Sequence, residues 1–293
     1  MAESESMRIC RRMDGIGRKI MIMSGKGGVG KTTVTVNLAK ALSRAGYKVG
    51  ILDTDIHGPN IAKMLGCENA VLEGSEGEIQ PVTVQGMKVV SLSFALENPS
   101  DAIVFRGPMK LNVIKQFLAD VNWGDLDYLL IDTPPGTGDE QLAAAQNIPA
   151  LAGCIIVTTP QAVSVLDSKR TVSFANQLKL RVLGVVENMS GLVCPHCGKI
   201  IDVFGKGGAE KMCIEEGVPL IGTIPLEVGL QIENGGTVSE DSLSGQAFSS
   251  IAQIIHSNTK PLTSKDIGYI PKDESCSPSA CASCTADCPS KKG

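Results

Sequence analysis

One stretch decides the fold of this chain: Ser24-Gly25-Lys26-Gly27-Gly28-Val29-Gly30-Lys31-Thr32-Thr33. A short apolar run, residues 19–23, precedes it, and a helical pattern over residues 31–45 follows it. A strand, a glycine-rich turn and a helix with the spacing G-x-x-x-x-G-K-T form a phosphate-binding loop. The glycines let successive backbone N–H groups point inward, and the N-terminus of the helix adds a positive dipole end. The stretch therefore predicts a site for a nucleoside triphosphate.

The side chains of the loop have different expected roles. Lys31 can reach the β- and γ-phosphates, and the Thr32 hydroxyl can ligate Mg²⁺. Lys26 is unusual, because an ordinary phosphate-binding loop does not need a second lysine. The residues expected to contact the nucleotide are Gly25, Lys26, Gly27, Gly28, Val29, Gly30, Lys31, Thr32 and Thr33. The alternative, a glycine-rich turn that binds nothing, leaves the flanking strand and helix unexplained.

Three aspartates follow two other apolar strands. Asp53 and Asp55 come after one of them, and Asp132 comes after another. Ligands of open parallel sheets gather at the C-terminal ends of strands, and a nucleoside triphosphatase needs acidic groups there to hold Mg²⁺ and to orient the attacking water. Each aspartate alone also fits a helix N-cap or a turn, but the three together favour the nucleotide site. Gly136 and Gly138 would let the segment after Asp132 move when the γ-phosphate leaves.

Strands and helices alternate along the rest of the chain. Strands are expected at residues 48–52, 128–131, 154–159, 181–187 and 219–223, and helices at 111–118, between 160 and 178, at 209–216 and at 246–255. A hairpin turned at Gln85-Gly86 is also expected. This alternation predicts an α/β fold with a doubly wound, mostly parallel sheet covered on both faces. We expect residues 1–18 to form a polar leader, 19–257 a single P-loop NTPase domain, and 258–293 a flexible, cysteine-rich tail.

The composition argues against several functional classes. A formal charge of −4 and a pI near 5.5 disfavour non-specific binding of nucleic acid. No apolar run reaches the roughly 18 residues that a membrane span needs, and the charged N-terminus lacks the apolar core of a secretory signal. We therefore expect a cytoplasmic protein without nucleic-acid or membrane partners. Ten cysteines in such a protein favour metal or redox sites over disulfides.

Cys194-Pro195-His196-Cys197 forms a C-x-x-C knuckle directly after a predicted strand. Its two thiolates can grip one metal but fill only half of a four-thiolate site. Three completions are open: the cysteines of the tail, a redox dithiol without metal, or the same pair in a second chain across a two-fold axis. A structural zinc knuckle is a further alternative. His196 is interpreted as a spacer, because no partner histidine lies nearby.

The C-terminal tail contains a second cysteine pattern, C-x4-C-x2-C-x3-C, formed by Cys276, Cys281, Cys284 and Cys288. The second half of the pattern matches the end of a ferredoxin motif, although the first spacing is longer. Nothing nearby would bury these thiols in a core. We therefore expect a metal or iron–sulfur tail, with a disordered tail of incidental thiols as the alternative. Cys154 lies inside an apolar strand and is expected in the core.

Several motifs together resemble the Mrp/ApbC family of iron–sulfur cluster carrier ATPases, relatives of MinD, ParA and the nitrogenase iron protein. The resemblance covers about residues 17–257 and rests on SGKGGVGKTT (24–33), DTDIHGPN (53–60), FRGPMK (105–110), NWGDLDYL (122–129), IDTPPGTGDE (131–140), TTPQAVSVLDSKR (158–170) and VENMSGLVCPHCG (186–198). The last two segments are much more specific than the phosphate-binding loop, which the whole superfamily shares.

The resemblance implies roles for the residues of the nucleotide site. Lys26 is similar to the lysine that crosses a dimer interface to contact the phosphates bound by the partner chain, where its charge would act much as an arginine finger does. The remaining positions match as follows: Lys31 and Thr32 would hold phosphate and Mg²⁺, Asp55 would position water, and Asp53 and Asp132 would support the metal. Asn188 is similar to an asparagine that contacts adenine.

The resemblance also implies a function. Cys194 and Cys197 are similar to the pair that shares a [4Fe–4S] cluster between two chains. The protein would then be a homodimer that uses ATP and Mg²⁺ and transfers its cluster to apo iron–sulfur proteins. The alternatives are a MinD/ParA-like positioning ATPase, which needs an amphipathic membrane helix or a basic DNA-binding face, and a zinc-knuckle metallochaperone NTPase. Some family members carry an N-terminal cysteine cluster, whereas this N-terminus offers only Cys10.

Overall fold

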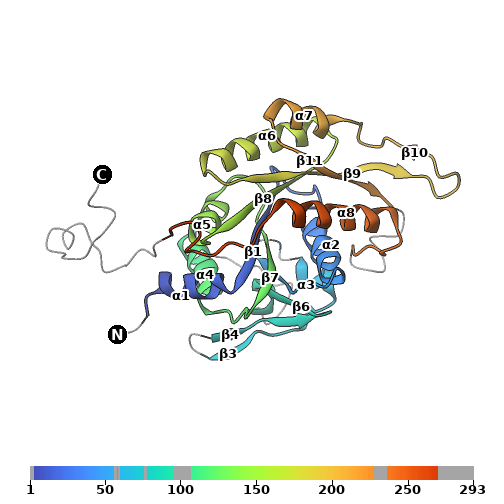
Figure 1. Cartoon of the computed structure of the whole chain (residues 1–293). Coiled ribbons are helices and arrows are strands. Elements are labelled where there is room, and N and C mark those ends of the chain that lie inside the picture. The colour runs from blue at the N-terminus through green and yellow to red at the C-terminus, as the bar shows by residue number, and fades with distance from the viewer. Residues whose placement is uncertain are drawn as a thin grey trace.

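The structure is a computed structural model that describes residues 3–55, 58, 60–75, 78–95, 107–227 and 236–269. The described residues form a nine-stranded sheet, shown in Figure 1. Eight strands follow one another in the order β10 (Ile200–Ile201), β9 (Val182–Val193), β8 (Leu151–Thr158), β1 (Ile16–Met23), β7 (Leu126–Asp132), β2 (Val49–Asp53), β6 (Met87–Ser91) and β5 (Val82–Val84). The ninth strand, β11 (Leu220–Leu226), pairs with β9, and β3 (Glu73–Ser75) pairs with β4 (Glu78–Gln80) in a separate ribbon.

Most neighbouring strands of the sheet run parallel. β1 lies between β7 and β8 and is parallel to both, and β2 is parallel to β7 and β6. Antiparallel pairs occur towards the margins, between β5 and β6 and between β9 and β10. Because parallel strands end at the same edge, β1, β2 and β7 bring Met23, Asp53 and Asp132 together. The predicted doubly wound, mostly parallel sheet is confirmed.

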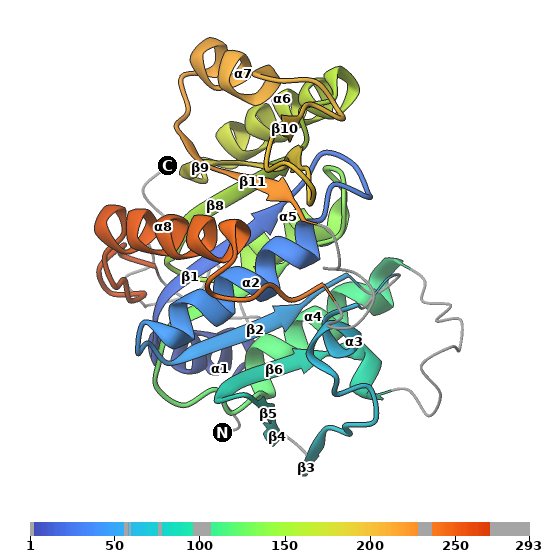
Figure 2. The ribbon, with the colours of Figure 1, turned by 90° about the vertical axis from the view of Figure 1, so that its right-hand side faces the viewer.

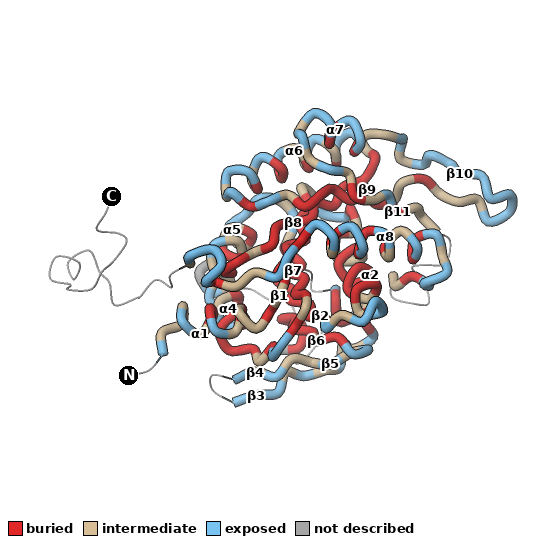
Figure 3. The backbone as a smooth tube through the Cα atoms, in the orientation of Figure 1, coloured by how far each residue is buried: buried red, intermediate tan, exposed pale blue. Residues whose placement is uncertain are grey.

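Helices cover both faces of the sheet. Their bounds are α1 (Glu5–Asp14), α2 (Lys31–Arg44), α3 (Ile61–Leu65), α4 (Gly107–Asp120), α5 (Asp139–Asn147), α6 (Ala162–Gln177), α7 (Gly208–Glu216) and α8 (Leu243–Asn258), with a 3₁₀ turn at Leu92–Ala95. One buried apolar cluster unites α2, α3 and α8 with one face, and Figure 2 shows α2 and α8 lying across the strands. A second cluster unites α1, α4, α5, α6 and α7 with the other face. The buried stretches in Figure 3 follow the central strands between these layers.

The expected hairpin is confirmed at Gln85-Gly86. Val82–Val84 and Met87–Ser91 pair antiparallel around these two residues. Both turn residues have positive φ, 51° for Gln85 and 79° for Gly86, as a two-residue type I′ turn requires. Among the described helices, none combines the length and the apolar character that a membrane crossing needs.

The N-terminal stretch differs from the expected polar leader. Residues Glu5–Asp14 form helix α1, which begins at an N-cap where the Ser4 hydroxyl accepts the N–H of Met7. Ile9 and Met13 are buried against α4 and the sheet. Half of the residues in Glu5–Asp14 are charged, but Ile9 and Met13 recur at helical spacing on one face, and this face is what packs.

The C-terminal segment also packs farther than expected. Leu262 donates its N–H to the carbonyl of Gly17 (2.9 Å), and the Ser264 hydroxyl donates to Asp14 (2.7 Å). The buried Lys19 ammonium donates to the carbonyls of Met13, Ile16 and Leu262 (3.1, 2.9 and 2.9 Å). The packed part of the chain therefore exceeds residues 19–257 at both ends and reaches at least residue 269. The rest of the predicted tail lies outside the described residues.

Candidate functional site

The phosphate-binding loop connects the end of β1 to the start of α2 and lines a cavity of about 480 Å³. Gly25 cannot carry a side chain, because a Cβ there would collide with the backbone of Asp167 in α6. Gly30 has φ of 80°, and a Cβ there would collide with the side-chain amide of Asn188. The loop is therefore shaped by neighbours on two other elements as well as by its own glycines.

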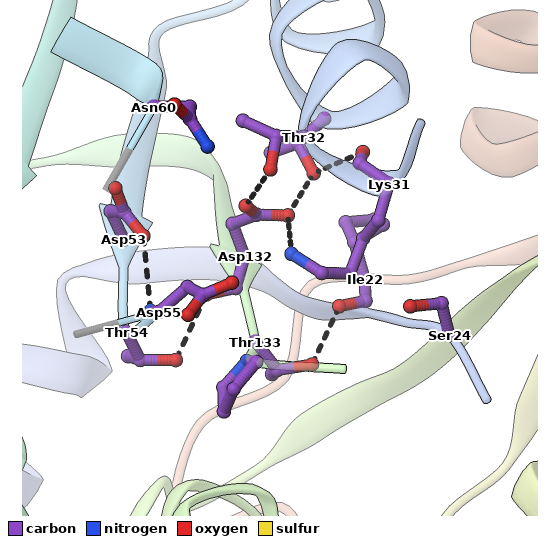
Figure 4. Close-up of polar contacts among 12 residues, drawn as sticks. Ile22, Ser24, Lys31, Thr32, Asp53, Thr54, Asp55, Asn60, Asp132 and Thr133 are labelled. Carbon is purple, nitrogen blue, oxygen red and sulfur yellow. Dashed lines mark hydrogen bonds and ion pairs between the residues drawn. The ribbon is translucent and has the colours of Figure 1, made fainter. Parts of the chain in front are cut away.

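Asp132, at the end of β7, is the centre of the polar contacts beneath the loop (Figure 4). Only 1 % of it is exposed. The Thr32 hydroxyl donates to Oδ2 (2.7 Å), and the Thr35 hydroxyl donates to Oδ1 (2.6 Å). Lys31 Nζ lies 2.8 Å from Oδ1. Three side chains from the first two turns of α2 thus converge on one carboxylate.

The Lys31 ammonium is held by charge more than by a directed hydrogen bond. Its distance to Asp132 is that of an ion pair, but within the described residues its Nζ meets no acceptor at a hydrogen-bonding angle. The side chain is 6 % exposed and lines the loop cavity. Its N–H groups are therefore available for a phosphate oxygen placed in the loop.

Asp53 is the second buried carboxylate of the site. The Ser91 hydroxyl donates to its Oδ2 and the Asp55 N–H donates to its Oδ1, both at 3.0 Å. Burial, reinforced by the nearby charge of Asp132, raises the pKa of Asp53 well above its ordinary value. Asp55 is half-buried and lines the loop cavity. The three predicted aspartates therefore gather at one edge of the sheet.

The oxygen atoms of this cluster suit a hard cation. A threonine hydroxyl and carboxylates are ligands that Mg²⁺ accepts, usually together with water and substrate phosphates. Thr32, Asp132 and Asp53 supply such atoms beside the loop. The residues present therefore fit Mg²⁺.

Sequence reasoning missed two positioning residues in α2. Thr35 lies one helical turn after Lys31, on the same face, which is the spacing that could have indicated its contact with Asp132. Asn37 is buried and donates from Nδ2 to the carbonyl of Gly236 (2.9 Å), while its Oδ1 accepts the N–H of Val238 (2.9 Å). Asn37 thus holds Gly236 at the rim of the cavity, a long-range contact without a local sequence signal.

The segment after Asp132 is tied to the end of β1. The Thr133 hydroxyl donates to the carbonyl of Ile22 (2.8 Å), and the Gly136 N–H donates to the carbonyl of Ser24 (2.8 Å). Gly136 has φ of 96°, a conformation that glycine adopts without strain. The expected movement of this segment, with Gly136 and Gly138 as its glycines, stays a prediction.

Asn188 lies in β9 and contacts the phosphate-binding loop. Its Nδ2 donates to the carbonyl of Val29 (2.9 Å), and the residue is 7 % exposed. The structure therefore shows Asn188 bracing the loop backbone. The adenine contact implied by the sequence resemblance stays a prediction.

Cys194 and Cys197 lie in the hairpin that joins β9 to β10. The Cys194 N–H donates to the carbonyl of Lys199, and the Gly198 N–H donates to the carbonyl of Cys194, both at 2.9 Å. Backbone N–H groups of His196 and Cys197 point at the Cys194 sulfur and lower its pKa. This favours the thiolate, the form that binds metals. In the described part of the chain, no third histidine, cysteine, aspartate or glutamate joins the pair in a metal-binding group.

Of the other cysteines singled out in the sequence, Cys154 falls within the described residues and the four of the tail do not. Cys276, Cys281, Cys284 and Cys288 lie outside the described residues. The last described residues pack beside α1, and Figure 1 shows them on the opposite side of the molecule from the β9–β10 hairpin. Cys154 is fully buried in β8, as expected, and burial raises its pKa to about 12.

Comparison with known proteins identifies the family. A family model described as ParA, NUBPL iron-transfer P-loop NTPase, matches residues 15–257. The chain belongs to this family. The motif-based resemblance is thereby confirmed, and the nucleotide site described above is that of a P-loop NTPase.

Curated relatives in this family carry iron–sulfur names. An iron-sulfur cluster carrier protein of Methanocaldococcus jannaschii is 54 % identical over 225 residues, which cover 76 % of this chain and 78 % of the relative. A cytosolic Fe-S cluster assembly factor, NUBP2 of Bos taurus, is 48 % identical over 84 % of this chain and 94 % of the relative.

Solved structures agree with the fold. A nucleotide-binding protein from Archaeoglobus fulgidus in complex with ADP is 36 % identical, with a TM-score of 0.66, over 86 % of this chain and 93 % of that chain. A chain of the MinC:MinD cell division protein complex of Aquifex aeolicus is 25 % identical, with a TM-score of 0.61, over 84 % of this chain and 98 % of that chain.

Proposed function

We propose that this protein binds and hydrolyses ATP and carries a [4Fe–4S] cluster, held between two copies of the chain by Cys194 and Cys197, to apo iron–sulfur proteins. One observation carries the proposal. Strand β9 contacts the phosphate-binding loop and leads directly into the hairpin that holds the two thiols of the knuckle. The names of the curated relatives support iron–sulfur cargo.

The nucleotide would bind along the loop Gly25–Thr33. Inward backbone N–H groups and Lys31 would hold its phosphates, Thr32 with Asp132 and Asp53 would hold Mg²⁺, and Asp55 would orient the attacking water. Bound Mg²⁺ neutralises charge that develops on the phosphate oxygens during transfer. ADP in the relative from Archaeoglobus fulgidus supports a nucleotide at this site.

Lys26 would complete the catalytic site from a second chain. In its own chain Lys26 is half-buried and lines the loop cavity; contact with the phosphates of a second chain would add a positive charge that stabilises a phosphoryl-transfer transition state. The thiol pair supports the same assembly, because two thiolates are half of the four that a [4Fe–4S] cluster takes. In a two-fold dimer, the partner chain would supply both the lysine and the second pair of thiolates.

The partners would be a second copy of this chain and apo iron–sulfur proteins. The word cytosolic in the names of NUBP2 relatives supports a cytoplasmic location for this chain as well. The negative net charge supports the absence of a nucleic-acid partner.

Iron counting after anaerobic reconstitution tests the cargo site. The iron content of the full-length protein is compared with that of the double variant Cys194→Ala/Cys197→Ala. Iron bound by other cysteines is present in both proteins and cancels in the difference. We expect the variant to lose about two iron atoms per chain, since a bridged cluster has four irons for two chains, and to lose cluster transfer while ADP binding survives. Cys67→Ala is the matched control, because Cys67 is a partly exposed thiol outside the knuckle.

Two results would contradict the proposal. Unchanged iron and sulfide in the double variant would remove Cys194 and Cys197 from the cluster site. Bound zinc without the broad absorbance near about 400 nm that iron–thiolate clusters show would support the zinc-knuckle metallochaperone instead.

A further inference from the structure

Strand β9 connects the two candidate sites physically. Up to Glu187 it pairs with β8 inside the sheet, and beyond this residue it continues beside β11 as far as Leu192 and enters the hairpin with β10. Figure 1 shows the strand leaving the body of the molecule towards β10. The part of β9 that touches the phosphate-binding loop therefore leads directly into the thiol pair.

Asn188 fixes the orientation of one peptide group in the loop. Its Nδ2 donates to the carbonyl of Val29 (2.9 Å). Because a peptide group is planar and trans, a carbonyl held towards Asn188 directs the N–H of Gly30 away from it. A loop that binds phosphate through its N–H groups depends on such orientations. This peptide joins Val29 to Gly30, and Gly30 has φ of 80° and no Cβ, so the glycine side of the peptide offers little steric resistance to its rotation.

Met189 stores backbone strain beside this contact. Its φ is 57°, in the left-handed region that residues with side chains seldom adopt. Its Cε lies 3.7 Å from where a Cβ of Gly30 would be. Glu187 pins the strand on the other side, because its Oε2 accepts the N–H of Ala209 in α7 (3.0 Å) and its Oε1 accepts the Ser190 hydroxyl (2.6 Å). β9 is thus anchored to α7 and to the loop, with a strained residue beside the loop anchor.

The hairpin beyond this point is tied to β9 by backbone hydrogen bonds. Val193 pairs with Ile200, Leu192 pairs with Ile201, and the Cys194 N–H donates to the carbonyl of Lys199 (2.9 Å). A rotation of β9 at Met189 would therefore carry the hairpin and its cysteines with it.

We propose that Asn188 and Met189 couple the occupancy of the phosphate-binding loop to the exposure of Cys194 and Cys197. A bound nucleotide stabilises the Val29 peptide in the orientation that Asn188 holds, and this keeps Met189 in its strained conformation. Without nucleotide the peptide turns, Met189 relaxes, and β9 rotates the hairpin. Met189 is in this sense a positioning residue. The inference rests on the proposed function only in treating the two cysteines as the cargo site.

Thiol reactivity in the cluster-free, full-length protein tests the coupling. Alkylation of Cys194 and Cys197 by iodoacetamide is followed by mass spectrometry of the peptide that contains both, with and without saturating ADP. We expect ADP to change the wild-type rate by about fivefold or more, within the usual range of coupling between sites. In Met189→Gly, which adopts the same φ without strain, we expect a change of less than about twofold, with ADP still bound.

Lys179→Gly is the matched control. Lys179 also has a positive φ, 55°, but lies before the other end of β9, so this variant should respond to ADP as the wild type does. If Met189→Gly does not fold, Met189→Ala removes the thioether beside Gly30 and should at least halve the response. A wild-type response in the folded Met189 variant, or no response in the wild type, overturns the coupling. Failure of the wild-type protein to bind iron through Cys194 and Cys197 would overturn the proposed function alone, because the alkylation assay contains no iron.

Discussion

The carboxylates of Asp53 and Asp132 determine the electrostatics of the nucleotide site. Both are almost fully buried, and the ammonium of Lys31 lies near both of them. Burial makes an uncompensated negative charge costly. A divalent cation relieves this repulsion, which is why a buried oxygen cluster next to a phosphate-binding loop suits Mg²⁺.

Replacing Asp53 with asparagine should stabilise the cation-free protein at high pH. The pKa of Asp53 is raised well above its ordinary value by burial and by Asp132. The folded state therefore binds more protons than the unfolded state between the two pKa values, and wild-type stability falls as the pH rises through the folded pKa. The Asp53→Asn variant has no carboxyl group to ionise at this position, so it should not lose stability in this way as the pH rises. The oxygen of its amide can still accept the Asp55 N–H. Thermal unfolding in EDTA should show a Tm advantage of the variant that grows from about pH 5 to about pH 8.

The control for this prediction is Asp125→Asn. Asp125 is exposed on the loop before β7, so its replacement should change the Tm by a similar small amount at both pH values. A Tm difference for Asp53→Asn that is independent of pH would show that Asp53 stays ionised in the folded protein.

The sequence predicted the main residues of the nucleotide site, but it did not predict the residues that hold them in place. Lys31, Thr32 and the aspartates follow from a motif and from strand ends, which are local patterns. Thr35 and Asn37 act through residues about one hundred or more positions away, Asp132 and Gly236. The position of Thr35 one helical turn after Lys31 was the one local indication of its role, and the partner of Asn37 becomes evident only in the folded chain.

At the scale of elements, the apolar strands and their helices were predictable, while the ends of the domain and of β9 were not. Strands such as residues 128–131 and 154–159 are continuous apolar runs, which a buried parallel sheet requires. β9 continues to Val193 through Asn188 and Ser190, whose polar side chains hide the strand in the sequence. Its extension depends on pairing with β11 and on the contact of Glu187 with α7, and both are tertiary.

The Lys19 ammonium links α1, β1 and the C-terminal segment through one buried set of hydrogen bonds. We expect Lys19→Met to weaken the packing of these three elements. The methionine would leave the carbonyls of Met13, Ile16 and Leu262 without their donor. We expect the free energy of unfolding at about pH 7 to fall by about 2 kcal/mol. Protease cleavage within residues 259–269 should also become faster, because Leu262 loses one of its two anchors. Urea titration and peptide mapping measure these effects.

The same contact predicts a pH effect of defined sign. Burial lowers the pKa of Lys19 to about 8, against about 10.4 in an unfolded chain. The folded state then binds fewer protons between these values, so the stability of the wild type relative to Lys19→Met should rise as the pH increases from about 8 to about 10. Lys260→Met, at an exposed neighbouring position, is the control. A stability difference that does not change over this pH range would contradict the lowered pKa.

At the scale of the whole molecule, the proposed dimer makes a testable prediction about Lys26. If Lys26 acts on the phosphates of a partner chain, Lys26→Ala should lower ATP hydrolysis by about 10³-fold while ADP affinity stays within about threefold. Mixing this variant with Lys31→Ala, whose own loop is disabled, should restore about a quarter of the wild-type rate. Half of the dimers would then be mixed, with one complete site in each.

This mixing experiment separates two arrangements of Lys26. Complementation requires the lysine of one chain to reach the loop of the other. No recovery of hydrolysis in the mixture, together with low activity of each variant alone, would place Lys26 in its own site. An equal loss of ADP affinity and hydrolysis in Lys26→Ala would also indicate a self-contained site.

The position of β1 between β7 and β8 affects how the chain folds during synthesis. Ile20 pairs with Leu130 and Gly153, so this early apolar strand must wait for distant partners, on the order of ten seconds at ribosomal speed. During that time the strand is a template for aggregation. Arg18 and Lys19 precede its most apolar part and act as charged gatekeepers in the nascent chain. In the folded protein both residues anchor the C-terminal segment, Arg18 through the Thr259 carbonyl (3.3 Å) and Lys19 through the Leu262 carbonyl (2.9 Å), so we expect the same two charges to limit aggregation of β1 before it pairs.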